Sequence, residues 1–172
     1  PGRAARGLAR PGDALPRAGR SAPALLGAVA AAALPRLREC EPRELSKTGW
    51  ACATAEHAAP ALFDAVAEEA TPRLREFNPQ DLANTVWAFA TAGVRADALY
   101  VAVAEAAVRD GLRGFSPQAQ ANTVWAFVTA GVRADALYAA VAEAAVRGGL
   151  RGFKPQDLAN TVWAFATADV RA

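Results

Sequence analysis

The sequence predicts an all-α fold, an α-solenoid in which helical hairpin repeats of 37–38 residues stack into a right-handed superhelix. A motif recurs at fixed spacing, and each copy contains two segments with helical periodicity. Alanine, the strongest helix former, is abundant, while strand formers occupy fixed and widely spaced positions. With 53% hydrophobic and 21% charged residues, the chain of 172 residues can bury enough apolar surface to fold.

The repeat is visible in the spacing of the aromatic residues. Phe77, Phe115 and Phe153 lie 38 residues apart, and each opens a near copy of one segment. The copies are FNPQDLANTVWAFATAGVRADALY, FSPQAQANTVWAFVTAGVRADALY and FKPQDLANTVWAFATADVRA. A more divergent copy starts at Cys40, 37 residues before Phe77. A fixed period of this length is typical of stacked repeat units.

The repeat divides the chain into a basic segment over residues 1–20 and a helical repeat domain over residues 21–172. The repeat domain comprises a half repeat (21–39), three whole repeats (40–76, 77–114 and 115–152) and a truncated repeat (153–172). The basic segment is rich in Ala, Arg, Pro and Gly, which fits an organellar transit segment and a plain linker equally well. Its five arginines and one aspartate leave the repeats slightly acidic, so bulk charge does not indicate a nucleic-acid partner.

The first helix of repeat 77–114, called helix A, is predicted over Pro79 to Ala92. Asn78 can cap it, Pro79 fits the first turn, and Gly93 can adopt the left-handed conformation just past its end. A helical wheel places an apolar arc on one side of helix A, formed by Leu82, Ala83, Val86, Phe89 and Ala90. The opposite side is predicted to be polar and is formed by Gln80, Asp81, Asn84, Thr85 and Thr91.

The second helix of the repeat, called helix B, is predicted to start with Asp97 as its cap. Its buried face is predicted to contain Leu99, Tyr100, Val103, Ala106 and Ala107. Glycines at 111 and 114 then break the chain before the next repeat. A single hairpin of this size cannot bury its apolar face, so the copies must stack, with successive A helices lining one surface.

The inventory of reactive side chains argues against an enzyme or a metal site. Two cysteines and one histidine are too few, because a structural zinc needs about four ligands and a cysteine nucleophile needs a placed base. Cys40 and Cys52 align with Phe77 and Phe89 and are therefore expected in the core, and His57 is expected to be inert. We expect no catalytic residue, no cofactor, no metal and no small-molecule substrate. The longest uncharged run is shorter than the roughly 20 residues of a membrane span, so no membrane partner is expected.

The segment PQDLANTVWAFA, which starts at Pro79 and recurs from Pro117 and Pro155, resembles the octotricopeptide repeat family of algal organelle proteins. It is also similar to the related FAST kinase-like leucine-rich, RAP-associated proteins. The resemblance is strong over residues 77–172 and weaker over 40–76. It implies an RNA-binding helical solenoid of chloroplasts or mitochondria that acts in processing, stability or translation of organellar transcripts. Its implied partners are single-stranded RNA and other RNA-processing proteins.

The polar side of the A helices is the natural candidate for contact with RNA. Gln80, Asn84 and Thr85 recur in the next two repeats as Gln118, Asn122, Thr123, Gln156, Asn160 and Thr161. Helical-repeat RNA binders use two or three side chains per repeat for each base, and amides both donate and accept hydrogen bonds. The competing interpretation is structural, with each asparagine bonded to the backbone of the neighbouring repeat.

Three further groups of residues qualify as candidates. Asn78, Ser116 and Lys154 differ between the copies, which suits them to distinguish one base from another. Arg95, Arg133 and Arg171 follow the ends of their A helices and could contact phosphates, although interaction with the helix dipole explains them as well. The tryptophans border the apolar arc, where packing between A helices is favoured over base stacking; they are Trp50, Trp87, Trp125 and Trp163.

Gln120 replaces the leucine found at Leu82 and Leu158, which predicts a polar amide directed into the interior of the repeat. The rival to RNA binding is a scaffold for protein–protein interaction, because helical solenoids serve that purpose too. Clustered arginines beside Asn84 would favour RNA, and an apolar groove there would favour a peptide.

Overall fold

The computed structural model describes residues 22–168, which form a chain of α-helices with no strand among them. The helices are α1 (Ala22–Ala33), α2 (Pro42–Thr54), α3 (Pro60–Ala70), α4 (Pro79–Ala92), α5 (Asp97–Arg109), α6 (Pro117–Thr129), α7 (Asp135–Arg147) and α8 (Pro155–Thr167). Two short 3₁₀ segments follow α1 and α3, at Leu34–Glu39 and Thr71–Glu76. The basic segment predicted over residues 1–20 lies outside the described residues.

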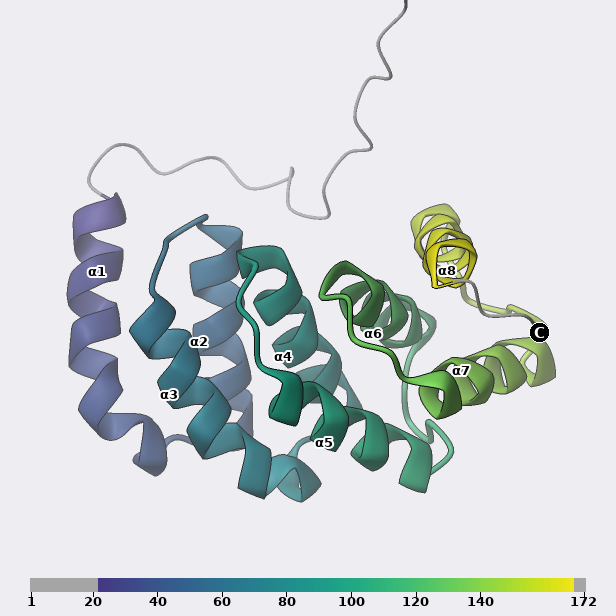
Figure 1. Ribbon diagram of the computed structural model, residues 1–172, viewed down its shortest axis with the longest axis horizontal. Coiled ribbons are helices and arrows are strands. Elements are labelled where there is room, and N and C mark those ends of the chain that lie inside the picture. Colours follow the sequence, from purple (N-terminus) through teal and green to yellow (C-terminus); the bar gives the residue numbers. More distant parts are fainter. Residues whose placement is uncertain (1–21, 169–172) are drawn as a thin grey trace, which may run out of the picture.

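The helices form two layers that run along the molecule (Figure 1). The A helices α2, α4, α6 and α8 pack side by side, each against the next, and this succession is the most extensive contact in the fold. The B helices α1, α3, α5 and α7 lie beside them in the same order. This arrangement confirms the predicted all-α solenoid of helical hairpins.

Local sequence determines the ends of α4 as predicted. The side-chain oxygen of Asn78 accepts a hydrogen bond from the backbone N–H of Asp81 at 2.9 Å, which satisfies one free donor of the first turn. Gly93 ends the helix with a φ of 67°, a conformation that costs glycine little. The helix therefore spans Pro79–Ala92, the range predicted from the capping residues.

The prediction that Asp97 caps helix B is wrong. Asp97 is the first residue of α5, and Ala96 precedes it as a cap without a side-chain hydrogen bond. The Asp97 carboxylate instead accepts a hydrogen bond from Arg95 at 2.8 Å. The same arrangement recurs at α7, where Asp135 is the first helical residue and pairs with Arg133. An acid in the first turn still favours the helix through its dipole.

Edge-to-face aromatic pairs join three of the B helices, α3, α5 and α7, to the A helix that follows each of them. Tyr100 of α5 and Phe127 of α6 have ring centroids 5.0 Å apart. The pairs Phe63–Phe89 and Tyr138–Phe165 have the same arrangement, at 5.0 and 5.7 Å. The Tyr100 hydroxyl also donates a hydrogen bond to the Val86 carbonyl of α4 at 3.0 Å. Helix α5 is thereby fixed between two successive A helices, and the repeats form one continuous core.

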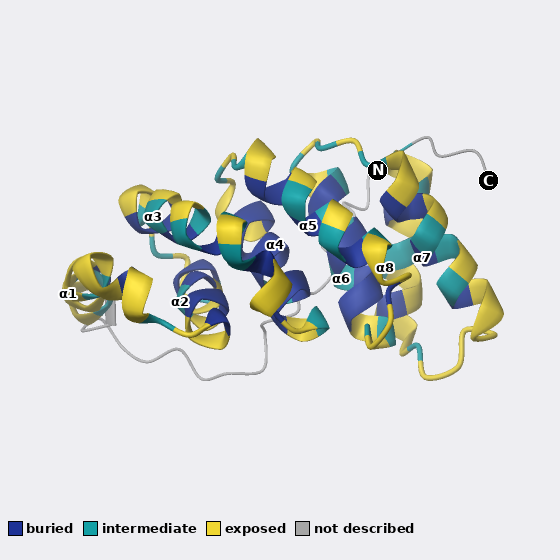
Figure 2. Cartoon of the chain, turned by 90° about the horizontal axis from the view of Figure 1, so that it is seen from below, coloured by how far each residue is buried: buried dark blue, intermediate teal, exposed yellow. Residues whose placement is uncertain are grey.

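The buried surface of helix A is wider than the predicted apolar arc (Figure 2). Asp81 and Thr85, predicted on the polar side, are only 6% and 1% exposed. An internal A helix contacts the preceding A helix, the following A helix and its own B helix, so a wheel with one buried side underestimates its burial. The buried hydroxyls of Thr85 and Ser46 are satisfied, because both donate hydrogen bonds to the Asp81 carbonyl, at 2.8 and 3.1 Å.

Gln120 is buried, as its alignment with leucine predicts. Its exposed fraction is 8%, and its side-chain nitrogen donates a hydrogen bond to the Phe115 carbonyl at 3.2 Å. Its side-chain oxygen is buried without a partner. An unsatisfied buried acceptor costs about 1–3 kcal/mol, so this position is a local weakness of the repeat.

We therefore expect Gln120→Leu to raise the free energy of unfolding by about 1–3 kcal/mol. Leucine fills the same position in α4 and removes the unpartnered oxygen. The change should appear in urea unfolding as a higher midpoint with an unchanged slope. The reverse substitution Leu82→Gln is the matched control and should destabilise the protein. A stability loss in Gln120→Leu would show that the amide is favourable at this position.

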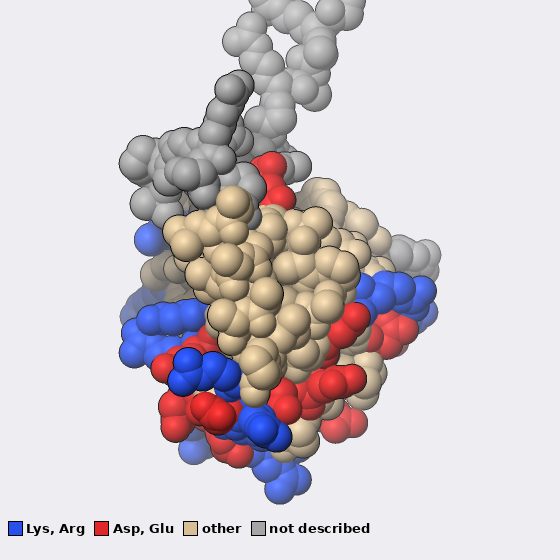
Figure 3. All heavy atoms as spheres, turned by 90° about the vertical axis from the view of Figure 1, so that its left-hand side faces the viewer, with Lys and Arg blue, Asp and Glu red and all other residues tan. Residues whose placement is uncertain are grey.

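The α1 end of the solenoid presents an apolar surface bordered below by charged residues (Figure 3). Leu25 and Val29 are 65% and 54% exposed. The corresponding residues of α3, Leu62 and Val66, are buried at 2% and 1%. Helix α1 therefore matches α3 in the spacing of its apolar residues and has the position of a B helix, but these residues are exposed in α1 and buried in α3.

Candidate nucleic-acid interface

Four positions of every A helix share one side of the helix, because they are spaced by four, three and four residues. We call these residues the A-helix strip. In α4 they are Gln80, Asn84, Trp87 and Thr91, and in α6 they are Gln118, Asn122, Trp125 and Thr129. In α8 they are Gln156, Asn160, Trp163 and Thr167, and in α2 they are Arg43, Lys47, Trp50 and Thr54. Since the A helices pack in succession, the strip repeats along one surface of the solenoid.

The amides of the strip are accessible and mostly free. The glutamines are exposed and the asparagines are half-buried in α4, α6 and α8. Gln80 donates a hydrogen bond to the side-chain oxygen of Asn84 at 2.8 Å. Within residues 22–168 the structure records no bond from Asn84, Asn122 or Asn160 to the backbone of a neighbouring repeat, so the structural ladder does not form. The amides are therefore available to a ligand.

The threonines that follow the asparagines do not belong to this surface. Thr85 and Thr123 are 1% and 0% exposed, and their hydroxyls donate to the carbonyls of Asp81 and Ala119 at 2.8 and 2.7 Å. Thr161 is half-buried and makes the equivalent bond within α8. The adjacent A helices cover Thr85 and Thr123, so these two side chains are not accessible on the surface where contact with RNA is predicted.

The residues that vary between repeats act at the helix starts. Ser116 caps α6 through a hydrogen bond from the Ala119 N–H at 3.1 Å, as Asn78 caps α4. Both side-chain oxygens are engaged in capping, so they are poor candidates for distinguishing bases. Lys154 is exposed at the start of α8, where its backbone N–H donates to the Asp157 carboxylate at 2.9 Å. Its ammonium group remains the only cation among these three variable side chains.

The arginines at the ends of the A helices form local ion pairs. Arg95 pairs with Asp97 at 2.8 Å, and Arg133 pairs with Asp135 at 2.9 Å. The hydrogen bond that Arg133 donates lowers the pKa of Asp135, and the hydrogen bond that Arg95 donates to Asp97 raises the pKa of Arg95. A paired arginine offers less charge to a phosphate than a free one. Arg171 lies outside the described residues.

The structure adds two basic residues that the sequence comparison missed. Arg43 and Lys47 occupy in α2 the places of Gln80 and Asn84, and both are exposed. They lie near Asp81, and burial raises the pKa of this carboxyl group. A hydrogen bond with the Asn78 backbone and the positive charges of Arg43 and Lys47 offset part of that rise. Neither forms an ion pair within residues 22–168. An alignment at the 37-residue offset could have identified both residues.

The tryptophans of the strip differ in exposure. Trp87 is 8% exposed and belongs to the core, which confirms the predicted packing between A helices for this residue. Trp125 is half-buried against the core. Trp50 in α2 is 38% exposed, and Trp163 in α8 is 43% exposed. The surface therefore carries an exposed aromatic ring at each end and amides between them.

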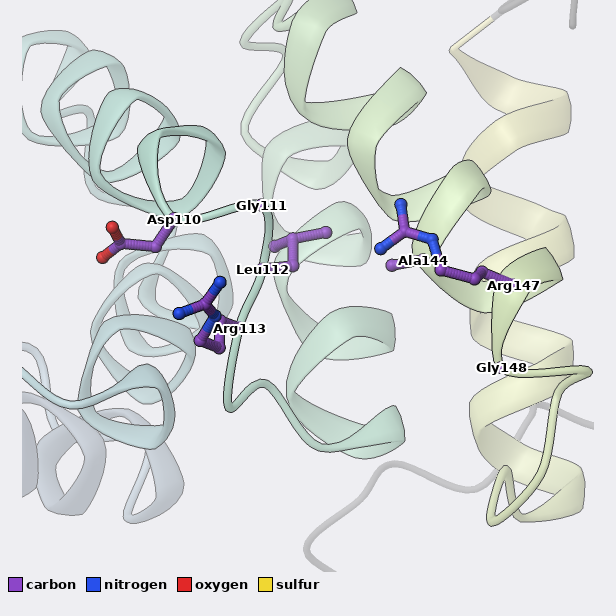
Figure 4. A pocket seen from close by; sticks show the side chains of 7 residues that line it. All are labelled: Asp110, Gly111, Leu112, Arg113, Ala144, Arg147 and Gly148. Atoms are coloured by element: carbon purple, nitrogen blue, oxygen red, sulfur yellow. The ribbon is translucent and has the colours of Figure 1, made fainter.

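Among the described residues, no other group of side chains forms a candidate site comparable to the A-helix strip. A shallow pocket lies between the turn after α5 and the end of α7, where Asp110 points away from Ala144 and Arg147 (Figure 4). Arg147 is engaged with Glu143 of its own helix. Residues 22–168 contain no cluster of three or more potential metal-ligating side chains, and none of their helices is long and apolar enough to cross a membrane. Cys52 is buried, which raises the pKa of its thiol.

Comparison with known protein families shows which family the chain belongs to. The family described as Tbc2 translation factor, N-terminal domain, matches residues 19–141, which is more than half of the chain and covers α1 to most of α7. A family described as a protein of unknown function (DUF1601) matches residues 135–162, in α7 and α8. No curated protein matches the chain. By its fold of stacked helical hairpins and by the extent of this match, the chain belongs to the Tbc2 translation factor N-terminal domain family.

Proposed function

We propose that this protein binds single-stranded RNA through the A-helix strip and acts in the translation, stability or processing of organellar transcripts. The proposal rests mainly on one observation. Accessible amide pairs recur on successive A helices, next to the unpaired cations Arg43 and Lys47. Amides bond base edges, and cations bond phosphates. The match to a translation factor family supports a role in translation. The proposal also relates the protein to the octotricopeptide repeat proteins of chloroplasts or mitochondria, with any chemistry supplied by its partners.

The rival function is a scaffold that binds another protein. A peptide-binding scaffold would need an apolar groove along the A helices. The strip in α4 and α6 instead presents amides and threonines around the buried Trp87 and the half-buried Trp125. The polar character of the strip favours RNA over an apolar peptide.

Titration of the full chain with a pool of short fluorescent single-stranded RNAs at two salt concentrations separates the two functions. RNA binding through phosphate contacts weakens as salt rises, because counterions are released on binding. We expect binding at low salt that falls steeply at high salt. A folded protein that binds no RNA at low salt would favour the scaffold.

Neutralising Arg43 and Lys47 together, as Arg43→Gln and Lys47→Gln, should reduce the salt dependence of RNA binding. Each phosphate contact to a single strand contributes about 0.7 to the slope of log K against log salt, so the slope should fall by about 1.4. The matched control is Arg95→Gln with Arg133→Gln, because both arginines already pair with aspartates. An equal loss of slope in the control would show that Arg43 and Lys47 contribute no more to phosphate binding than the paired arginines do.

A further inference from the structure

We infer that the phosphates of the bound RNA lie along one edge of the solenoid, where each turn from a B helix into an A helix carries an unpaired arginine. The inference rests on the proposed function. We call these residues the edge arginines, and they are Arg38, Arg75, Arg113 and Arg151. Each lies five residues before the first residue of the A-helix strip, as Arg75 does before Gln80. One edge arginine therefore stands beside the start of every A helix from α2 to α8.

The same local structure holds each edge arginine. The residue before it is a leucine, whose carbonyl accepts a hydrogen bond from the backbone N–H three residues later. The four bonds run from Cys40 to Leu37 at 3.0 Å, from Phe77 to Leu74 at 3.3 Å, from Phe115 to Leu112 at 3.0 Å and from Phe153 to Leu150 at 3.3 Å. Leu37, Leu74 and Leu112 are buried and anchor their turns to the core. Figure 4 shows Leu112 and Arg113 directed to opposite sides of the turn.

The arginine keeps its place although the turns are built in two ways. The first two turns are the 3₁₀ segments Leu34–Glu39 and Thr71–Glu76. In the later two, Leu112 and Leu150 have φ values of 58° and 57°, a conformation that is uncommon for leucine. The spacing of the edge arginines also changes, from 37 to 38 residues. The position of the arginine is therefore not the by-product of one turn geometry.

The edge arginines retain their charge for a ligand. All four are exposed, and none forms an ion pair within residues 22–168. The acids of the first two turns are engaged elsewhere, because Glu39 pairs with Arg36 at 3.8 Å and Glu76 pairs with Arg73 at 3.3 Å. Asp110, the acid of the third turn, forms no ion pair with Arg113. A free guanidinium group is a strong donor to phosphate oxygens.

The opposite edge of the solenoid differs in this respect. There each A helix turns into its own B helix (Figure 1). Arg95 and Arg133 lie in two of these turns and pair with Asp97 and Asp135, at 2.8 and 2.9 Å. Unpaired positive charge therefore recurs with the repeat on the edge that leads into the A helices. A strand whose bases face the A-helix strip would place its phosphates, one charge per nucleotide, along that edge.

Salt dependence of RNA binding tests the inference in the full chain with Arg75→Gln and Arg113→Gln. Titration with a pool of short fluorescent single-stranded RNAs gives the slope of log K against log salt. Each lost phosphate contact removes about 0.7 from this slope, so the slope should fall by about 1.4. Between about 50 and 200 mM salt, the affinity of the variant should then change about sevenfold less than that of the unmodified protein. Substituting all four edge arginines should lower the slope by about 2.8.

Two matched variants separate a phosphate contact from other roles. Arg95→Gln with Arg133→Gln removes the same charge at the opposite edge and should leave the slope unchanged. Arg75→Lys with Arg113→Lys keeps the positive charge and should retain the slope. Circular dichroism verifies that each variant folds.

An unchanged slope in the variant with Arg75→Gln and Arg113→Gln would overturn the inference, and so would an equal loss in the lysine variant or at the opposite edge. RNA binding by the unmodified protein would leave the proposed function standing in each of these cases. Failure of the unmodified protein to bind RNA at low salt would instead contradict the proposed function.

Discussion

Replacing Phe127 by alanine should lower the free energy of unfolding by about 3–5 kcal/mol. The Phe127 side chain is completely buried and lies edge-to-face with Tyr100, 5.0 Å between ring centroids, at the junction of two repeats. A cavity here removes contacts from both repeats. Because domains of this size are stable by only about 5–15 kcal/mol, the loss should be evident in urea unfolding followed by circular dichroism.

Phe165 provides the matched control, since it has the same place in α8 and pairs with Tyr138 at 5.7 Å. It is only half-buried, so Phe165→Ala should cost clearly less than Phe127→Ala. Equal losses at the two positions would contradict the account of the core, in which internal repeats are stabilised by neighbours on both sides.

The second large effect is expected on RNA affinity. Replacing Asn84, Asn122 and Asn160 together by alanine removes one base contact from each of three repeats. Each contact contributes about 1–3 kcal/mol, so the affinity for RNA should fall at least about 100-fold. The asparagines are half-buried and make no bond to neighbouring repeats within the described residues, so folding should be preserved. Fluorescence anisotropy measures the affinity, and circular dichroism measures the fold.

The control carries three substitutions at corresponding positions of the B helices, Glu68→Gln, Glu105→Gln and Glu143→Gln. These residues are exposed, and removing their negative charge should leave RNA affinity unchanged or slightly higher. A triple asparagine variant that binds RNA as tightly as the unmodified protein would rule out the amides as base contacts.

The architecture could be predicted from the sequence because its signals are local and repeated. The bounds of α4 follow from Asn78, Pro79 and Gly93, residues whose capping geometry depends only on the adjacent turn. The solenoid follows from the 38-residue period, and the burial of Gln120 follows from its alignment with leucines. The capping role predicted for Asp97 is wrong, because α5 begins at Asp97 itself and the carboxylate accepts a hydrogen bond from Arg95.

The surface was harder to predict because it depends on how helices pack. A wheel assigns Thr85 to the polar side, yet the neighbouring A helices bury it. Arg43 and Lys47 are hard to identify from the sequence, because the near-identical copies share amides at these two positions and the α2 copy has diverged from them. That these two cations form no ion pair among the described residues can be seen only in the three-dimensional structure.

Photocrosslinking can locate bound RNA on the solenoid directly. A photoreactive benzophenone side chain is placed at position 118 on the A-helix strip of α6, or at position 139 on the exposed side of α7. Each protein is irradiated with labelled single-stranded RNA at low salt. We expect strong crosslinking from position 118 and only background from position 139. Crosslinking from position 139 that equals or exceeds that from position 118 would contradict an RNA-binding surface formed by the A helices.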